Sequence, residues 1–379
     1  MSESRSQSTP RAQEVRLRGQ AVYLFAFDVA YEMKSRPTGT LLGYPLAEYA
    51  VDMSKRLPRY FFYRPQMVRL PPVERFSDRG LIRVERTVKV LPIGAVSIAC
   101  RVRFDVPALG DLVHYHDLAF TNGTLQQDAR QLAEDIQKEL SPLFVRPVER
   151  LMEEEAYTVF CLESPTCGDD GGSIAAEAWL AQHRRAVAAL LTQEETPEAL
   201  SHQETEETTS IHLSYYGRDL AVVDWDAALL IDEPRNFEES LYLMELANLQ
   251  LAELEAYDRM IDASLERSYR DLRAAGLKNR ANVLRDLQEL RIDLARFNDE
   301  LSNITKFFGD WHLARLYQGL AARLHLSDWH KSIDRKLQTL DDLYAMLAHD
   351  RMNRLMLILE MTIVILFVLD LGMLFLKAK

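Results

Sequence analysis

The sequence predicts an α/β or α+β domain, followed by a long antiparallel helical stalk and one C-terminal transmembrane helix. Short apolar runs with strand-like alternation fill the first part, Leu-rich segments with a helical period follow, and an uninterrupted apolar segment ends the chain. These observations divide the 379 residues into five parts. The parts are a disordered tail (1–13), an α/β domain (14–232), a helical coiled-coil region (233–326), a stalk helix (327–354) and a transmembrane helix (355–376).

The C-terminal segment from Asp328 to Lys379 has the pattern of one continuous helix. Its last part, Leu355 to Leu376, has 22 residues, of which 15 are Leu, Ile, Val or Phe and none is Lys or Arg. A helix of this length spans roughly 33 Å, which is enough to cross the hydrocarbon core of a bilayer. The sequence therefore predicts a single-pass membrane protein whose partner is the lipid bilayer.

Two acidic residues, Glu360 and Asp370, lie inside this apolar segment. Each carboxylate costs about 2.5–3.5 kcal/mol at mid-membrane on insertion scales, so the two offset much of the gain from the apolar residues. One interpretation is that headgroup water reaches them or that they are protonated. The other is that they face copies of the same helix, because Glu360, Ile363, Phe367, Asp370 and Leu374 follow the 3, 4, 3, 4 spacing of a helix seam.

Composition limits the function classes. A net charge of −12 argues against a nucleic-acid partner, since phosphate binding needs a basic surface. Three cysteines at irregular spacing (Cys100, Cys161 and Cys167) fit packed or loop thiols in a reducing compartment. The first 13 residues have no apolar core, so we expect no signal peptide, a C-terminal anchor and a cytoplasmic N-terminal domain.

Alternating and amphipathic patterns predict the elements of the α/β domain. Apolar β patterns occur at 15–27, 60–63, 81–90, 96–104, 157–162, 211–215 and 220–230. Helical patterns occur at 125–143 and at 173–193, the latter with Ser173 as its expected N-cap. The Glu- and Thr-rich segment from Thr192 to Thr209 is predicted to be an exposed loop.

Two clusters in this domain contain residue types that could form a chemical site. The run from His114 to Asp117 offers two imidazoles and a carboxylate, but no second cluster at ligand spacing accompanies it, which favours a solvated turn over a metal site. The Gly-rich run from Gly168 to Ser173 lacks a phosphate-loop pattern, which favours a plain loop. No nucleophile or paired-carboxylate signature stands out, so we expect no enzymatic activity, no catalytic residue and no cofactor.

Three long helices are predicted beyond residue 233. They cover 237–275, 277–308 and the terminal stalk, with a short helix at 311–326 before the stalk, and short Gly-containing turns make successive helices antiparallel. Leu-rich seams follow the coiled-coil period from Leu287 to Phe308 and again from Ile333 to Leu347. These seams fit either the core of one chain or packing between chains.

The segment from Leu337 to Leu359, which contains Arg351-Met352-Asn353-Arg354-Leu355-Met356, resembles the stalk and first membrane helix of CorA-type magnesium transporters. In that family these helices line the pore of a pentamer. The resemblance places Asn353, Met356, Leu359, Phe367 and Asp370 on the pore side, with Glu360 beside Asp370. The Gly-Met-Asn signature and the second membrane helix of that family are missing here.

The plan of an α/β domain with one terminal anchor also resembles the "required for meiotic nuclear division" family of single-pass membrane proteins. Leu359-Glu360 is similar to the start of its Leu-Glu-Trp segment, although Met361 replaces the Trp. The leading expectation is therefore a membrane-anchored, homo-oligomeric scaffold or sensor without enzymatic activity. The alternative is a channel or transporter for Mg²⁺ or another divalent cation, with a pore formed by the C-terminal helix.

Overall fold

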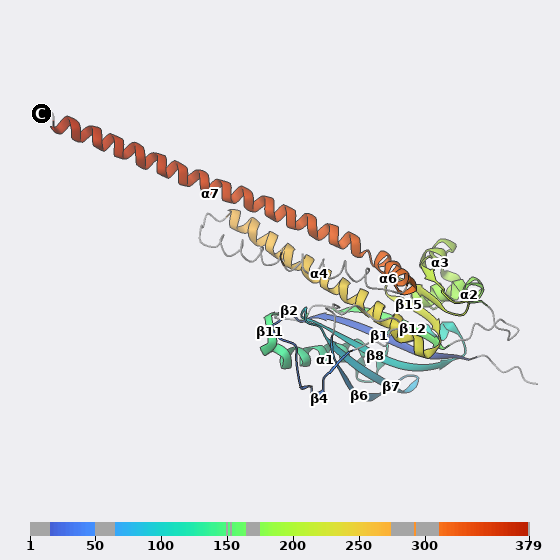
Figure 1. The fold of residues 1–379 in the computed structure, drawn as a ribbon. Helices are drawn as coiled ribbons and strands as arrows, with labels where there is room; N and C mark the ends of the chain where they lie inside the picture. The colour runs from blue at the N-terminus through green and yellow to red at the C-terminus, as the bar shows by residue number, and fades with distance from the viewer. Residues whose placement is uncertain are drawn as a thin grey trace, which may run out of the picture. The chain divides into compact units, whose positions relative to one another are not determined.

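The computed structural model describes residues 16–49, 65–148, 151, 154–163, 175–273, 292 and 311–377. The chain divides into two compact units. The first unit comprises Met1–Ala256 and Asp299–Ser327, and the second comprises Tyr257–Asn298 and Asp328–Lys379. The first unit contains the sheet and the second contains the long C-terminal helix, so the α/β N-terminal region and the apolar terminal helix are both present (Figure 1).

A nine-stranded mixed sheet forms the centre of the first unit. Its strands, in spatial order, are β13 (His212–Leu213), β14 (Leu220–Val223), β15 (Ala227–Asp232), β12 (Glu155–Glu163), β1 (Leu17–Asp28), β8 (Ala95–Val106), β7 (Gly80–Val90), β6 (Gln66–Ser77) and β5 (Ala47–Glu48). All neighbours in this sheet are antiparallel except β12 and β15, which are parallel.

Three small ribbons and a set of helices complete the described elements. The ribbons pair β2 (Ala30–Met33) with β11 (Phe144–Pro147), β3 (Thr40–Leu41) with β4 (Tyr44–Pro45), and β9 (Ala119–Phe120) with β10 (Gly123–Thr124). The α-helices are α1 (Leu125–Leu140), α2 (Ala176–Leu191), α3 (His202–Thr208), α4 (Phe237–Arg273), α6 (Trp311–Arg323) and α7 (Leu326–Lys377). Short 3-10 helices are η1 (Leu109–Tyr115), η2 (Ser141–Leu143), η3 (Pro197–Ala199) and η4 (Pro234–Asn236).

Strand β1 is buried on both faces, which explains its continuous apolar run from Ala21 to Phe27. One set of alternating side chains, including Tyr23 and Phe25, packs in a core that also contains Ile136 of α1. The opposite face of the sheet is covered by α4, and Figure 1 shows α1 and α4 on opposite sides of the sheet. The sheet therefore lies between two helical layers.

Several sequence predictions are confirmed. The patterns at 81–90, 96–104 and 157–162 correspond to β7, β8 and β12. The pattern at 125–143 gives α1, whose N-terminus is capped by Thr124, with the backbone N–H of Gln127 donating to its side chain at 3.2 Å. The helix predicted from Phe237 begins at that residue, and Cys100 and Cys161 are buried free thiols in the sheet.

Two predictions in this domain are wrong. The segment 192–209 is not an exposed loop, because it contains η3 and α3, and Thr205, Thr208 and Thr209 are buried. The cap at Ser201 and the burial of one side of α3 outweigh the low helix propensity of Thr. The pattern at 220–230 is not one strand, because the chain turns at Asp224 to Asp226 and forms the antiparallel pair β14 and β15.

The second unit contains the C-terminal part of α4 and nearly all of α7. Lys336 of α7 makes ion pairs with Asp258 and Asp262 of α4, at 2.7 and 2.8 Å, so these two segments lie side by side. Ile261 and Ile333 are fully buried. The predicted helix at 277–308, the strand at 60–63 and the loop at 168–172 lie outside the described residues, so the antiparallel stalk stays a prediction. The helix predicted at 173–193 is α2, but its N-cap is Ala175 and not Ser173 as expected.

Candidate functional site

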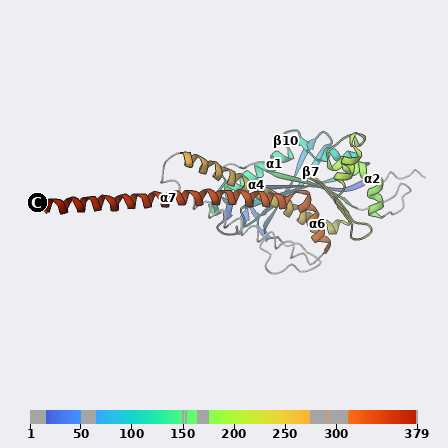
Figure 2. The same ribbon diagram turned by 90° about the horizontal axis from the view of Figure 1, so that it is seen from above.

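Helix α7 has 52 residues and runs without a break into the apolar segment, as Figures 1 and 2 show. Within it, Leu355–Met373 is long and apolar enough to cross a membrane, with a mean hydropathy of 2.4 and none of its residues buried. In the described chain this is the single segment with these properties. One membrane-spanning helix is therefore consistent with the fold, as the sequence predicts.

The six candidate residues on α7 lie on one face of this helix. Asn353, Met356, Leu359, Glu360, Phe367 and Asp370 are all exposed, Met356 at 58%, Leu359 at 62% and Phe367 at 68%. At 100° per residue, these positions fall within a sector of about 120°. Their shared face is a property of the regular helix, whereas what covers this face stays a prediction.

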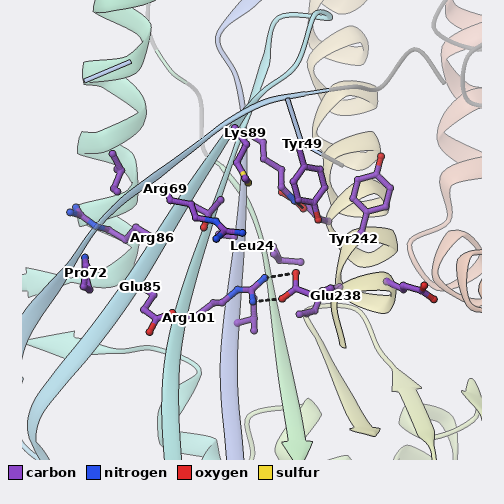
Figure 3. A pocket seen from close by; sticks show the side chains of 18 of the residues that line it. Leu24, Tyr49, Arg69, Pro72, Glu85, Arg86, Lys89, Arg101, Glu238 and Tyr242 are labelled. Carbon is purple, nitrogen blue, oxygen red and sulfur yellow. Dashed lines mark hydrogen bonds and ion pairs between the residues drawn. The ribbon is translucent and has the colours of Figure 1, made fainter. Parts of the chain in front are cut away.

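A second candidate site lies in the first unit, where α4 crosses the sheet. Here a cavity of about 600 Å³ opens between the strands β6, β7 and β8 and the first turns of α4 (Figure 3). Its charged lining consists of six basic residues, Arg69, Arg83, Arg86, Lys89, Arg101 and Arg235, and four acidic residues, Glu85, Glu238, Glu239 and Glu245. The lining is thus net positive by 6 − 4 = +2, in a chain whose net charge is −12.

The floor of this cavity is a buried ion pair. Lys89 of β7 binds Glu245 of α4, and Ser97 of β8 donates its hydroxyl to the same carboxylate at 2.6 Å. Lys89 also lies 3.8 Å above the ring of Tyr49, a cation–π contact. Burial, reinforced by the charge of Glu245, raises the pKa of Tyr49. The ion pair therefore joins α4 to two neighbouring strands from inside the fold.

One wall of the cavity is a second ion pair. Arg101 of β8 holds Glu238 of α4 through both guanidinium Nη atoms, one of them at 2.9 Å (Figure 3). The hydrogen bond from Arg101 lowers the pKa of Glu238, and the charges of Lys89 and Arg69 act in the same direction. The Nε atom of Arg101 is buried and has no hydrogen-bond partner among the described residues. The guanidinium of Arg101 is therefore committed to Glu238 through its two Nη atoms.

The run His114 to Asp117 has a different structure from the predicted solvated turn. His114 and Tyr115 end η1, and His116 is buried against Phe160, with its ring Nε2 2.6 Å from the carbonyl oxygen of Leu190. Burial lowers the pKa of His116, which favours the neutral ring. Among the described residues no group of three or more His, Cys, Asp or Glu is placed to hold a metal ion.

The sequence patterns alone do not indicate the cavity residues. Strand β7 alternates between apolar positions such as Val84 and Val88 and polar positions such as Glu85 and Lys89. The apolar positions predict the strand, but the pattern does not show that the polar ones line a cavity. In α4, every residue from 241 to 250 is buried, including Glu245. A carboxylate inside a Leu-rich helical segment was the signal that could have indicated this site.

These observations define a mixed α/β sheet domain joined to a long helix with an apolar end. Residues 18–238 match the protein family described as "Uncharacterized protein MJ0711, N-terminal domain", and the chain belongs to this family. A relative from Methanocaldococcus jannaschii, "Uncharacterized protein MJ0711", is 26% identical over 219 residues, which cover 57% of this chain and 64% of the relative. The match thus spans less than two thirds of that relative. No solved structure matches the chain.

The family match covers the strands of one candidate site and does not reach the other. It contains the cavity strands and ends at Glu238, in the first turn of α4. Helix α7 lies outside the matched residues. Any role of α7 must therefore be argued from this chain itself.

Proposed function

We propose that this protein is anchored in a membrane by its C-terminal helix and acts there as a homo-oligomeric scaffold or sensor without enzymatic activity. The observation that carries the proposal is the segment Leu355–Met373, in which none of the residues is buried. Nineteen helical residues span roughly 28 Å, close to the thickness of the hydrocarbon core. In water this segment would expose an apolar surface far larger than the patches of ordinary soluble proteins.

Oligomerisation follows from the acidic residues on this helix. Glu360 and Asp370 are exposed in the single chain, and in lipid each would cost about 2.5–3.5 kcal/mol. Copies of the same helix that meet along the face of these acids would remove the carboxylates from hydrocarbon. The resemblance to the CorA stalk, with its central ring of helices, supports such an assembly. We place the N-terminal domain on the cytoplasmic side.

Alkaline extraction of membranes that contain the full chain tests the anchor. The parent protein is expected to stay in the membrane pellet, while the double variant Val364→Arg and Leu366→Arg is released, because two Arg near mid-membrane add about 5–7 kcal/mol to insertion. The matched control places Arg at Gln338 and Asp342, which are exposed stalk positions outside the apolar segment. Release of the parent and the control together with the double variant would reject the anchor.

A cation channel is a second candidate, favoured by the two carboxylates on one helix face. In a ring of α7 helices, Glu360 and Asp370 would form acidic rings that attract divalent cations. Mg²⁺ flux into liposomes is then expected for the parent and is expected to fall sharply in Glu360→Gln and Asp370→Asn. If the parent shows no flux, or if both variants keep it, the scaffold or sensor is the remaining proposal.

A further inference from the structure

The cavity between α4 and the sheet has more positive charge than its acidic residues compensate. Glu238 is held by Arg101, and Glu245 is held by Lys89 and Ser97, so the two inner acids are committed to their own partners. Arg69 and Arg83 are exposed at the cavity and make no ion pair among the described residues. Arg86 also makes no ion pair among the described residues and donates to the carbonyl oxygen of Pro71. Three guanidinium groups thus accompany the two remaining acids of the lining, Glu85 and Glu239, in a strongly acidic protein.

Arg69 is close to the centre of this site. Figure 3 shows Arg69 and Arg101 pointing to the side of Tyr49 and Glu238, whereas Arg86 points away from them. Its charge contributes to lowering the pKa of Glu238, after the hydrogen bond from Arg101. The cavity therefore offers the exposed guanidinium groups of Arg69 and Arg83 to one occupant.

We propose that this cavity binds a small soluble organic phosphate. Guanidinium groups match phosphate oxygens with paired hydrogen bonds, which makes arginine a frequent ligand of phosphate. A cavity of about 600 Å³ falls in the range of small-molecule sites and exceeds what an inorganic phosphate fills. Leu70, Pro72 and Leu241 supply apolar lining for the organic part. The site lies in the first unit, so this proposal stands or falls independently of the membrane anchor.

The experiment uses the full chain in dodecyl maltoside at low salt, with ADP as the phosphate probe and adenosine as its uncharged match. We expect ADP to bind and to raise the unfolding temperature, and adenosine to do neither. Arg69→Gln is expected to weaken ADP binding about tenfold or more, because it removes a charge-assisted hydrogen bond. Arg103→Gln is the control, since Arg103 is an exposed arginine of the same strand as Arg101 and is not part of the cavity lining.

A reciprocal variant keeps the test valid if Arg69→Gln unfolds. Glu85 is exposed in the cavity and is the cross-strand partner of Arg101, so Glu85→Gln removes a repulsive charge and is expected to tighten ADP binding. Absence of ADP binding, or equal binding by the parent and both cavity variants, overturns the proposal. Stabilisation only by micelles doped with phosphatidic acid would assign the site to a lipid headgroup and would overturn the soluble ligand.

Discussion

Glu245 of α4 is in polar contact with two neighbouring strands, β7 and β8. Its carboxylate forms an ion pair with Lys89 and accepts a hydrogen bond from the hydroxyl of Ser97. The side chains of Glu245 and Lys89 are each 9% exposed. We predict that Glu245→Ala lowers the free energy of unfolding by about 3–5 kcal/mol, because Lys89 is left charged and buried without a partner. Thermal or denaturant unfolding of the full chain in detergent measures the loss.

A double variant separates the ion pair from simple packing. Glu245→Leu combined with Lys89→Met replaces both charges by apolar side chains of similar size. We expect this double variant to be much more stable than Glu245→Ala, since a buried ion pair is often no better than well-packed apolar residues. If both variants lose the same free energy of unfolding, the apolar side chains do not repack at this site. The loss in Glu245→Ala would then not be caused by the unpaired Lys89.

Glu253 predicts a pH dependence. This residue of α4 is 4% exposed, and burial, with the nearby charge of Asp28, raises its pKa well above the ordinary value of 4.5. Above a pH of about 4.5 the folded chain therefore keeps a proton on Glu253 that the unfolded chain releases. Because unfolding releases this proton, the free energy of unfolding falls as the pH rises above about 4.5. We expect Glu253→Gln to be more stable than the parent at pH 7 to 8, and the two to converge near pH 4.

The control for this comparison is Glu255→Gln. It changes the same residue type two positions along the same helix, at a site that is half-buried rather than fully buried. Unfolding temperatures of the three proteins across this pH range provide the measurement. A difference between Glu253→Gln and the parent that persists unchanged at pH 4 would contradict the buried proton.

At the scale of the element, β1 depends on the absence of a side chain at Gly19. A Cβ atom placed there would lie 1.9 Å from the carbonyl oxygen of Cys161 on β12, and 2.9 Å from the ring of Phe104 on β8. We predict that Gly19→Ala disrupts the pairing of β1 with β12 and destabilises the protein by several kcal/mol, on the order of other severe core changes. Unfolding of the full chain in denaturant tests this.

Gly110→Ala is the matched control. A Cβ at Gly110 meets nothing within 4 Å, so the change is expected to alter stability by less than about 1 kcal/mol. If Gly19→Ala is as stable as Gly110→Ala, the close approach of β1 and β12 does not limit the sheet.

The elements that the sequence predicted correctly are those with a strong period. The alternation in β7 and the apolar runs of β1 and β12 reflect burial by the sheet neighbours and the helices on both faces. Strand β6 was not predicted, because Pro71 and Pro72 interrupt its pattern at a register shift between Leu70 and Val73. A bulge that accommodates two prolines is visible only in the pairing with β7.

Candidate sites differ in the same way. The shared face of Glu360 and Asp370 could be predicted because one regular helix places them by spacing alone, whereas their role stays a prediction. The cavity was not predictable, because Arg69, Arg101 and Glu238 come from β6, β8 and α4, and only the strand register and the position of α4 bring them together. Local periods thus predict elements and linear sites, whereas sites built from several elements need the topology.

In an assembly of whole molecules, copies of the chain would meet along α7. Ile363 and Ile365 are almost equally exposed in the single chain, at 58% and 54%. At 100° per residue, Ile363 lies between Glu360 and Asp370 on the helix surface, while Ile365 lies about 180° from the middle of that face. The two residues therefore have similar exposure in the single chain. In an assembly along the acidic face, Ile363 would lie at the interface between chains and Ile365 would lie on the opposite side.

Disulfide crosslinking of variants with one added cysteine in α7 tests the assembly in membranes. We predict that Ile363→Cys forms a covalent dimer on mild oxidation and that Ile365→Cys does not, because only the first thiol meets its counterpart in a neighbouring chain. The parent protein, which retains Cys100, Cys161 and Cys167, gives the background. Equal crosslinking at both positions would indicate random collision in the membrane, and preferential crosslinking at Ile365 would contradict an assembly along the acidic face.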